Sequence, residues 1–590
     1  MAVILPPELI LACLERLSSS DADTIPTLLN FGSSSRANLS LSRSPALWRP
    51  ITQSHYPPRY TSQTSPAACD DTNESDPLAY FAGRALKNRR AREIVRDLLK
   101  PLNRLAAVDE LRGSLGTDVV DELGKPAAFT EEKRPETWLS LQFWAREARR
   151  TLLVEEALRV WSGIVQRDEA GEEAPDDFER GLNCFAAFRG LDPAALSRTH
   201  YDLSHHPRLV EATSHPPYEG SQRLEWLSTE VVDYMTSIGI RPAADGSFHD
   251  LDNHLVALRM GANGADAPYG TLPMTLVAIF CSLFRRLPIA SELSIRAKPV
   301  GFPGTVLAGL SYEGSDEWVY VNVFAKGKIL SRETMTVMLR AMGATPTDGF
   351  FQPASAREMS LRVARNILTS VQQGERVPGE PISHKDTIES LYSVAHALHT
   401  LVSSRDVDQA EVETYADWLV SLVQAEYPLD VAYLEKRILP LQTPERKRRM
   451  QGLCKAIRED DASRKEEKPV SAAIRWKIGH IFRHRLFGYV AVVRGWDYTC
   501  EASEQWIRQM RVDTLPYGRN QPFYHVIVED GSVRYVANEN ITATPIDDDE
   551  ADAFLDHDTI GKYFRKRERQ EDQRWAFVPS QDVEAEYPDS

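Results

Sequence analysis

Two polar stretches divide the chain and argue against a fold built on a single core. Residues 56–77 are rich in Ser, Thr and Pro, and residues 459–472 read EDDASRKEEKPVSA. Neither stretch has the apolar period of a helix or a strand, which is typical of linkers. At 590 residues the chain also exceeds the roughly 250–300 residues beyond which single cores stop growing. The sequence therefore predicts a multidomain protein.

The apolar pattern outside the linkers changes from helical to mixed and back. Residues 78–215 and 383–458 repeat apolar side chains every three to four positions, which predicts helices. Residues 216–382 add strand-like runs such as TVLAGLSYEG, and this mixture predicts an α+β core. Residues 473–546 hold short β-rich runs between turn residues, typical of a small barrel-like domain, and residues 547–590 are predicted to be a charged tail. The predicted fold class is mainly α with α+β parts.

Charge and cysteine usage limit the partners and cofactors. A net charge of −16 argues against coating nucleic acid by bulk electrostatics. The six cysteines are spread singly, with no C-x-x-C pair and no neighbouring histidine cluster. This usage fits reduced thiols in the cytoplasm or the nucleus and carries no zinc signature. We expect no metal and no cofactor.

An apolar run, VILPPELILACLERL, occupies residues 3–17. No basic residue precedes it and charges interrupt it, so it does not have the pattern of a signal peptide. It is also shorter than the roughly 20 apolar residues of a bilayer span, and we expect no membrane partner. Pro6 and Pro7 suit the first turn of a helix, and the apolar residues that follow form one face. That helix either packs in a core or docks on a partner.

The first 55 residues carry three short signals in order. From start to end these are Leu5-Pro6-Pro7-Glu8-Leu9-Ile10, Leu28-Leu29 and Pro45-Ala46-Leu47-Trp48-Arg49. Their order resembles the F-box family, although SSSRANLSL is more polar than the third helix of that family. The resemblance implies a short helical domain that docks on the Skp-type adaptor of a cullin ubiquitin ligase. The adaptor-binding residues that it implies are Leu5, Pro6, Leu9, Leu14, Leu47 and Trp48.

The middle of the chain resembles a second family. The matching positions, in order, are Asn253, Leu255, Leu258, Pro273, Thr275, Leu276, Arg286, Gly301, Phe302, Pro303, Gly304, Phe324, Gly327, Leu330 and Ser331. This pattern is similar to the transglutaminase-like family associated with SirB proteins, which implies an α+β domain over residues 216–382.

The chemistry of that family needs a thiolate at a helix start, a histidine base and a group that orients the histidine. The helix start after Pro273 carries Met274 and Thr275, the histidine position is Thr305, and the aspartate position is Asn322. We therefore expect a scaffold without transglutaminase-like catalysis. The competing hypothesis is a thiol enzyme that pairs Cys281 with His249 or His254.

Residues near the C-terminus carry the densest motif. It comprises Ile478-Gly479, Arg483-His484-Arg485, Phe487-Gly488-Tyr489, Val492-Val493, Trp496-Asp497, Trp506, Gln521-Pro522-Phe523-Tyr524 and Tyr535-Val536-Ala537-Asn538-Glu539-Asn540-Ile541. The run resembles the YccV/HspQ family, also called the hemimethylated-DNA-binding domain. Between Arg475 and Ile541 nine basic and seven acidic residues nearly cancel, whereas DNA readers usually show a strongly basic face. We therefore expect this domain to bind a protein rather than DNA. The candidate binding surface is Arg483, Arg485, Phe487, Tyr489, Trp496 and Tyr524.

The order of the three resemblances matches a class of F-box proteins with a C-terminal YccV domain. It predicts a non-catalytic substrate-recognition subunit of a Skp–cullin–F-box ubiquitin ligase. Its partners would be a Skp-type adaptor, a cullin and a target protein that the sequence does not name. The alternative is a DNA- or chromatin-associated protein that acts through its C-terminal domain.

Overall fold

The computed structural model describes residues 7–17, 23–56, 76–128, 134–244, 246–256, 270–377, 379–402, 409–557, 559–571 and 573–588. Internal contacts divide the chain into two compact units. The first comprises Met1–Lys87 and Leu153–Leu419, and the second comprises Asn88–Leu152 and Val420–Ser590. The boundaries fall within three helices, α5 (Pro77–Leu98), α8 (Trp138–Ala170) and α19 (Gln409–Ala425).

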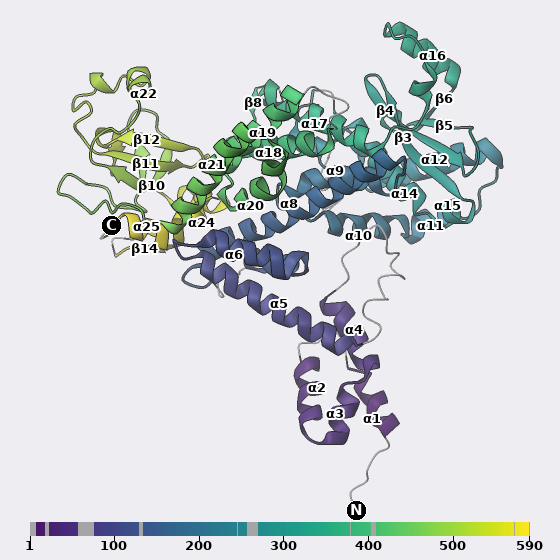
Figure 1. Ribbon diagram of the computed structural model, residues 1–590, viewed down its shortest axis with the longest axis horizontal. Coiled ribbons are helices and arrows are strands. Elements are labelled where there is room, and N and C mark those ends of the chain that lie inside the picture. Colours follow the sequence, from purple (N-terminus) through teal and green to yellow (C-terminus); the bar gives the residue numbers. More distant parts are fainter. Residues whose placement is uncertain are drawn as a thin grey trace, which may run out of the picture. The chain divides into compact units, whose positions relative to one another are not determined.

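The chain begins with four short helices (Figure 1): α1 (Pro7–Leu14), α2 (Thr24–Ser33), α3 (Arg36–Ser42) and α4 (Pro45–His55). Helix α3 starts after Ser35, whose hydroxyl accepts a hydrogen bond from the amide of Asn38. Leu28, Leu47, Trp48 and Ile51 form the buried core of these helices. Leu11, Leu14 and Leu17 pack against it, as do Leu78 and Phe81 at the start of α5.

The rest of the first unit combines helices with an antiparallel sheet. Its helices are α9 (Asp177–Ala187), α10 (Pro193–Ser204), α11 (Pro207–Thr213), α12 (Gly220–Ser237), α14 (Pro273–Arg285), α15 (Pro288–Glu292), α16 (Arg332–Ala341), α17 (Ala356–Gln373) and α18 (His384–Leu401). Helices α16, α17 and α18 start after Ser331, Ser355 and Ser383, each of which accepts a hydrogen bond from an amide of the first turn.

The main sheet of this unit has the order β3-β4-β5-β6. Its strands are β3 (Ile295–Phe302), β4 (Thr305–Tyr312), β5 (Val319–Asn322) and β6 (Lys328–Leu330). The two-stranded pairs β1 (Arg241–Pro242) with β2 (Gly270–Thr271), and β7 (Glu375–Val377) with β8 (Glu380–Pro381), complete the unit. Helix α14 packs against β3 and β4.

The second unit combines helices with a five-stranded antiparallel sheet of order β12-β11-β10-β9-β13. Its strands are β9 (Ile481–His484), β10 (Val490–Asp497), β11 (Phe523–Val528), β12 (Val533–Ala537) and β13 (Ile541–Thr542), with the hairpin β14 (Phe564–Arg569) and β15 (Trp575–Pro579). Its helices are α6 (Arg104–Glu110), α7 (Val120–Gly124), α20 (Val431–Tyr433), α21 (Pro444–Ala462), α22 (Glu504–Gln509), α23 (Asp548–Asp552), α24 (Ile560–Tyr563) and α25 (Gln581–Glu586).

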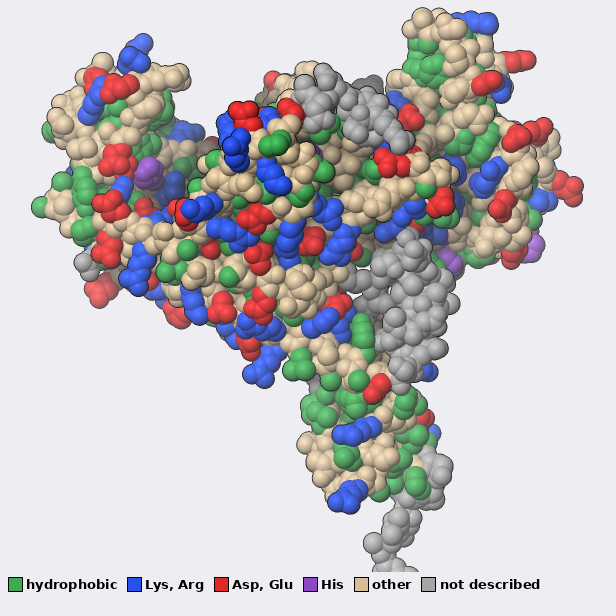
Figure 2. All heavy atoms as spheres, viewed as in Figure 1, with side chains coloured by type: hydrophobic (Ala, Val, Ile, Leu, Met, Phe, Trp, Pro, Cys, Tyr) green, Lys and Arg blue, Asp and Glu red, His purple; other side chains and the backbone are tan. Residues whose placement is uncertain are grey.

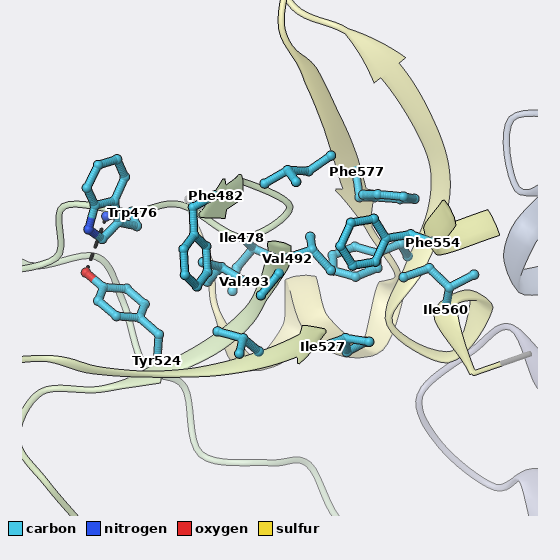
Figure 3. Close-up of a cluster of buried hydrophobic side chains, with 14 of the residues drawn as sticks. Trp476, Ile478, Phe482, Val492, Val493, Tyr524, Ile527, Phe554, Ile560 and Phe577 are labelled. Carbon is cyan, nitrogen blue, oxygen red and sulfur yellow. Dashed lines mark hydrogen bonds between the residues drawn. The ribbon is translucent and has the colours of Figure 1, made fainter. Parts of the chain in front are cut away.

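The largest core of the second unit joins the sheet to the end of the chain (Figure 3). Phe482, Val492 and Ile527 of the sheet pack in one buried cluster with Phe554 and Phe577 from beyond residue 546. The prediction that residues 547–590 form a charged tail is therefore wrong. Their charged residues outnumber the apolar ones, but the apolar ones enter the core while the charges stay outside, and the domain extends past residue 546.

The predicted fold class, mainly α with α+β parts and a small C-terminal β domain, is confirmed. The linker predicted at 56–77 lies largely outside the described residues, and α21 extends into the start of the linker predicted at 459–472. None of the helices among the described residues combines the length and the hydropathy that a bilayer span requires.

Candidate binding sites

The four N-terminal helices place the predicted adaptor-binding residues in different environments. Leu5, Pro6 and the side chain of Leu9 lie outside the described residues. Leu47 and Trp48 are almost fully buried, and the Trp48 indole donates to the carbonyl of Ser42 at 2.7 Å. The expectation that these two side chains face a partner is thus wrong, because they hold the four helices together.

Two exposed leucines were not among the predicted adaptor-binding residues. Leu29 on α2 is 58% exposed and Leu39 on α3 is 39% exposed. Figure 2 shows hydrophobic side chains gathered on the visible face of these helices. Leu14 is partly buried against their core. An apolar surface beside a small core is typical of a site that a partner covers.

Helix α14 begins where the transglutaminase-like resemblance would place a nucleophile. Met274 and Thr275 are buried there, and the hydroxyl of Thr275 donates to the carbonyl of Asn253 at 3.1 Å. Two turns further along, Cys281 is fully buried, and burial raises the pKa of its thiol to about 12. Such a thiol is almost entirely protonated at neutral pH and is a poor nucleophile.

The two other positions at which the resemblance would place catalytic groups lie on neighbouring strands of the sheet. Thr305 begins β4 and Asn322 ends β5. Since Ala308 pairs with Val321 and the two strands are antiparallel, Asn322 lies opposite Leu307 and diagonal to Thr305 on one face of the sheet. The amide oxygen of Asn322 accepts a hydrogen bond from the Ala325 amide at 3.0 Å. A hydroxyl and an amide therefore stand at the two positions where the sequence resemblance would place a base and its orienting carboxylate.

His249 and His254, the histidines of the thiol-enzyme hypothesis, both meet Ser370 of α17. A nitrogen of each ring lies 3.1 Å from the Ser370 hydroxyl oxygen. Burial, followed by the charge of His249, lowers the pKa of His254 to about 3. Among the described residues, the charged groups that act on the Cys281 thiol are Arg285 and Glu179, not a histidine. The geometry therefore gives no support to a Cys281–histidine pair.

A buried ionic cluster joins α9 to the end of α14. The Arg285 guanidinium donates to both Glu179 carboxylate oxygens at 2.6 Å, and Arg286 donates to one of them at 2.9 Å. Burial alone would raise the pKa of Glu179, but the two arginines lower it to about 2. His200 contacts the Ser282 hydroxyl beside this cluster. These charges are enclosed and paired, which suits a role in holding the helices together.

The candidate surface of the C-terminal domain separates into exposed and buried residues. Trp496 and Tyr524 are fully buried, and the Tyr524 hydroxyl accepts hydrogen bonds from the amides of Arg475 and Trp476 (Figure 3). Their assignment to a binding surface is therefore wrong, since both belong to the core. Phe487, in contrast, is 70% exposed, and its ring lies parallel to that of Tyr489.

The two arginines of the predicted surface do not share a strand face. Strand β9 ends at His484, so Arg485 lies beyond it and is exposed. Arg483 forms an ion pair with Glu550 of α23, which neutralises its charge. Burial lowers the pKa of His484 to about 4, and its ring accepts hydrogen bonds from the amides of Leu486 and Phe487. His484 thus supports the loop, as expected of a structural histidine.

The sequence did not single out a polar cluster around Asp497. The carboxylate of Asp497 accepts hydrogen bonds from the Tyr535 hydroxyl at 2.6 Å and from Lys468, and lies 3.1 Å from the Nε2 atom of His525. Burial would raise the pKa of Asp497, but hydrogen bonds from these three side chains hold it well below its usual range. Asp497 and Tyr535 belong to the YccV-like motif, whereas Lys468 and His525 lie outside it, and no local pattern predicts that these side chains meet. Together they fix the orientation of the His525 ring.

His525 lines a cavity with a volume of about 880 Å³ within the second unit. Residues of α8, α21 and α24 line it together with Arg494 of β10. Ligand pockets are commonly about 300–1,000 Å³. The described residues contain no group of three or more His, Cys, Asp or Glu side chains that could hold a metal ion.

Comparison with known families supports two of the resemblances. Residues 474–571 match the model described as "Hemimethylated DNA-binding protein YccV like". Residues 271–365 match the model of the transglutaminase-like superfamily. Both predicted resemblances are confirmed, and the first match extends into the folded region beyond residue 546.

Three curated relatives share one name. Proteins called "F-box only protein 21" from Pongo abelii and Homo sapiens are 26% and 27% identical over 326 and 322 residues. These alignments cover 51% of this chain and 47% and 48% of the relatives, so the chain spans about half the length of the curated relatives it matches. No solved structure matches the chain. The chain is thus a multidomain protein with a transglutaminase-like segment and a YccV-like C-terminal domain, similar to proteins named F-box only protein 21.

Proposed function

We propose that this protein is the substrate-recognition subunit of a Skp–cullin–F-box ubiquitin ligase. The N-terminal helices would bind a Skp-type adaptor and, through it, a cullin. The remaining domains would hold a target protein near a charged ubiquitin-conjugating enzyme. Such a subunit accelerates transfer by proximity and supplies no catalytic group. We expect it to act in the cytoplasm or the nucleus.

The similarity to proteins named F-box only protein 21 carries this proposal. The N-terminal helices support it independently, because they expose Leu29 and Leu39 beside a core of only a few buried residues. A docked partner would remove these apolar side chains from water, which is favourable.

The transglutaminase-like domain would serve as a scaffold. Its fold brings Thr305 and Asn322 onto one sheet face, but neither side chain is a base or a carboxylate. Cys281 is enclosed and its pKa is raised. These residues support a non-catalytic role for this domain.

Binding of a purified Skp-type adaptor to the full chain tests the proposal. Leu29→Asp combined with Leu39→Asp should weaken binding at least 100-fold, because a carboxylate would have to be buried without a partner. Leu9→Asp tests the contribution of the first helix. Leu86→Asp is the matched control, since Leu86 is 66% exposed on α5, beyond the four helices. Adaptor binding that survives both the double variant and removal of residues 1–55 would refute the proposal.

The alternative is a DNA- or chromatin-associated protein, which the description of the matching YccV-like model favours. Ion pairs reduce the basic charge available to phosphates, since Arg483 pairs with Glu550 and Arg519 pairs with Glu504 and Asp513. Titration of the full chain with unmethylated, hemimethylated and fully methylated duplexes at physiological salt decides between the two. We expect weak binding without a methylation preference, whereas submicromolar binding to one methylation state would establish the alternative.

A further inference from the structure

The cavity of the second unit has one wall from the YccV-like domain and one from helices. Arg494, His525 and Tyr563 belong to the first wall. The helical wall is partly apolar and includes Trp144 of α8 and Ile457 of α21. Figure 2 shows a hollow between the β domain and α21 with Lys and Arg side chains inside it.

Arg494 is directed to this cavity by an irregularity of its strand. The pairing of β10 with β11 shifts register between Val493 and Gly495, so Arg494 is the extra residue of a β-bulge. Bulges re-aim side chains and recur beside functional sites. The Nε atom of Arg494 is buried and has no hydrogen-bond partner. Its guanidinium carbon lies 4.7 Å from the centre of the Tyr563 ring.

A second cation shares that ring. The Nζ atom of Lys562 lies 5.6 Å from the centre of Tyr563, and Lys562 also lines the cavity. No carboxylate among the described residues forms an ion pair with Arg494 or Lys562. The nearby Asp497 is already engaged by three side chains. Two positive charges beside one aromatic ring, without a counterion, form a site for an anionic group.

The rest of the cavity decides what kind of anion fits. Seven Asp and Glu residues line the cavity, Glu426 and Asp460 of the helical wall among them, and together they would repel a polyanion such as nucleic acid. The apolar side chains Trp144 and Ile457 favour a ligand with apolar groups next to its charge. A peptide segment satisfies both conditions, because a single carboxylate can meet the cations while its neighbours pack on the helices.

We propose that this cavity binds a peptide segment in which an Asp or Glu side chain lies next to an apolar residue. The carboxylate accepts hydrogen bonds from Arg494 and Lys562, and His525, held by Asp497, contacts the peptide. The inference rests on the proposed function in one respect, that the peptide belongs to a target protein.

Selection of displayed random decapeptides on the immobilised full chain tests this inference. We expect the selected peptides to share an Asp or Glu beside an apolar residue, and replacement of that residue by Asn or Gln to weaken binding at least tenfold. Arg494→Gln combined with Lys562→Gln should weaken binding at least tenfold as well. Arg508→Gln, at an exposed position on α22 that does not line the cavity, should leave it unchanged.

A second variant avoids dependence on the two cations. Ala456 is an exposed residue of α21 that lines the cavity, so Ala456→Trp should block the peptide while the helix still folds. Selected peptides without acidic residues, binding that survives these substitutions, or displacement of the peptide by duplex DNA would overturn the inference. Adaptor binding, measured on the same variants, should be unchanged. If the unmodified chain binds the selected peptides but does not bind the adaptor, only the proposed function is refuted.

Discussion

The transglutaminase-like and YccV-like regions use the same kinds of polar residue in opposite ways. In the first, Glu179 is enclosed with its arginines, and His254 is enclosed with Ser370. In the second, Asp497 is enclosed, but its partner His525 remains about one-third exposed at a cavity. A residue type alone therefore does not reveal a site. A hydrogen-bonded side chain can contact a ligand only if part of it remains exposed, whereas a fully enclosed one can only stabilise the fold.

The largest loss in the free energy of unfolding is expected from Glu179→Ala in the enclosed cluster. It would leave Arg285 and Arg286 buried without their shared carboxylate, and removing one partner of a buried ion pair costs about 3–5 kcal/mol. Urea unfolding, with hydrogen exchange of α9 and α14 to assign the transition, measures the loss. Asp348→Ala removes the exposed ion pair with Arg332 and should cost less than about 1 kcal/mol. Equal losses of stability in the two variants would show that the enclosed ion pair contributes no more than the exposed one.

A smaller loss is expected from Asp497→Asn in the YccV-like region. The substitution removes the charge that receives three hydrogen bonds, and charged hydrogen bonds contribute about 1.5–3 kcal/mol each. The Asn oxygen can still accept some of them, so we expect about 2 kcal/mol, measured by the same urea titration. Asp513→Asn is the control, because Asp513 pairs with Arg519 at the surface. No loss in Asp497→Asn would mean that the cluster does not fix His525.

Acid should destabilise the transglutaminase-like region before the carboxylates titrate. Burial, with smaller effects of nearby positive groups, lowers the pKa values of His200 and His254 to about 3, whereas an unfolded histidine has a pKa of about 6.5. The unfolded chain thus binds more protons between these values, and stability falls as pH drops through that window. From pH 7 to 5.5 we expect about 1 kcal/mol per histidine.

The free energy of unfolding of His254→Gln, measured at pH 7 and at pH 5.5, checks the predicted pH dependence. Burial also lowers the pKa of His399 on α18 to about 4, so the variant should lose about a third of the pH-dependent change and keep the remainder from His200 and His399. An undiminished pH dependence would show that His254 is not held neutral in the folded protein.

The sequence motifs predicted the transglutaminase-like and YccV-like resemblances because each motif fixes a local backbone requirement. Gly479 is an example, since a Cβ atom there would lie 1.7 Å from the carbonyl oxygen of Phe577 and its φ angle is +81°. The amide of Phe577 also donates to the carbonyl of Gly479 at 3.0 Å. The motif therefore encoded a contact with residues that the charge pattern had assigned to a tail.

The parts that the sequence did not predict depend on contacts between distant residues. Glu179 meets Arg285 across 106 positions, and His525 meets Asp497 across 28. No local period reports which polar side chains a fold encloses. The same limit explains why Trp48 and Trp496 were assigned to surfaces, because a motif marks a residue as required without telling whether it packs inward or outward.

The smallest effect on binding is expected from substitution or alkylation of Cys281. With a pKa raised by burial from about 9 to about 12, its thiolate is about 1,000-fold rarer at pH 7 than for an ordinary thiol. Iodoacetamide should therefore modify the exposed Cys13 in the folded protein and leave Cys281 unmodified until urea unfolds its domain, as peptide mass spectrometry would record. Cys281→Ala should leave peptide and adaptor binding unchanged. Labelling of Cys281 as fast as Cys13 would mean that α14 opens to solvent. The polar groups of the transglutaminase-like region would then be accessible, as His525 of the YccV-like region is.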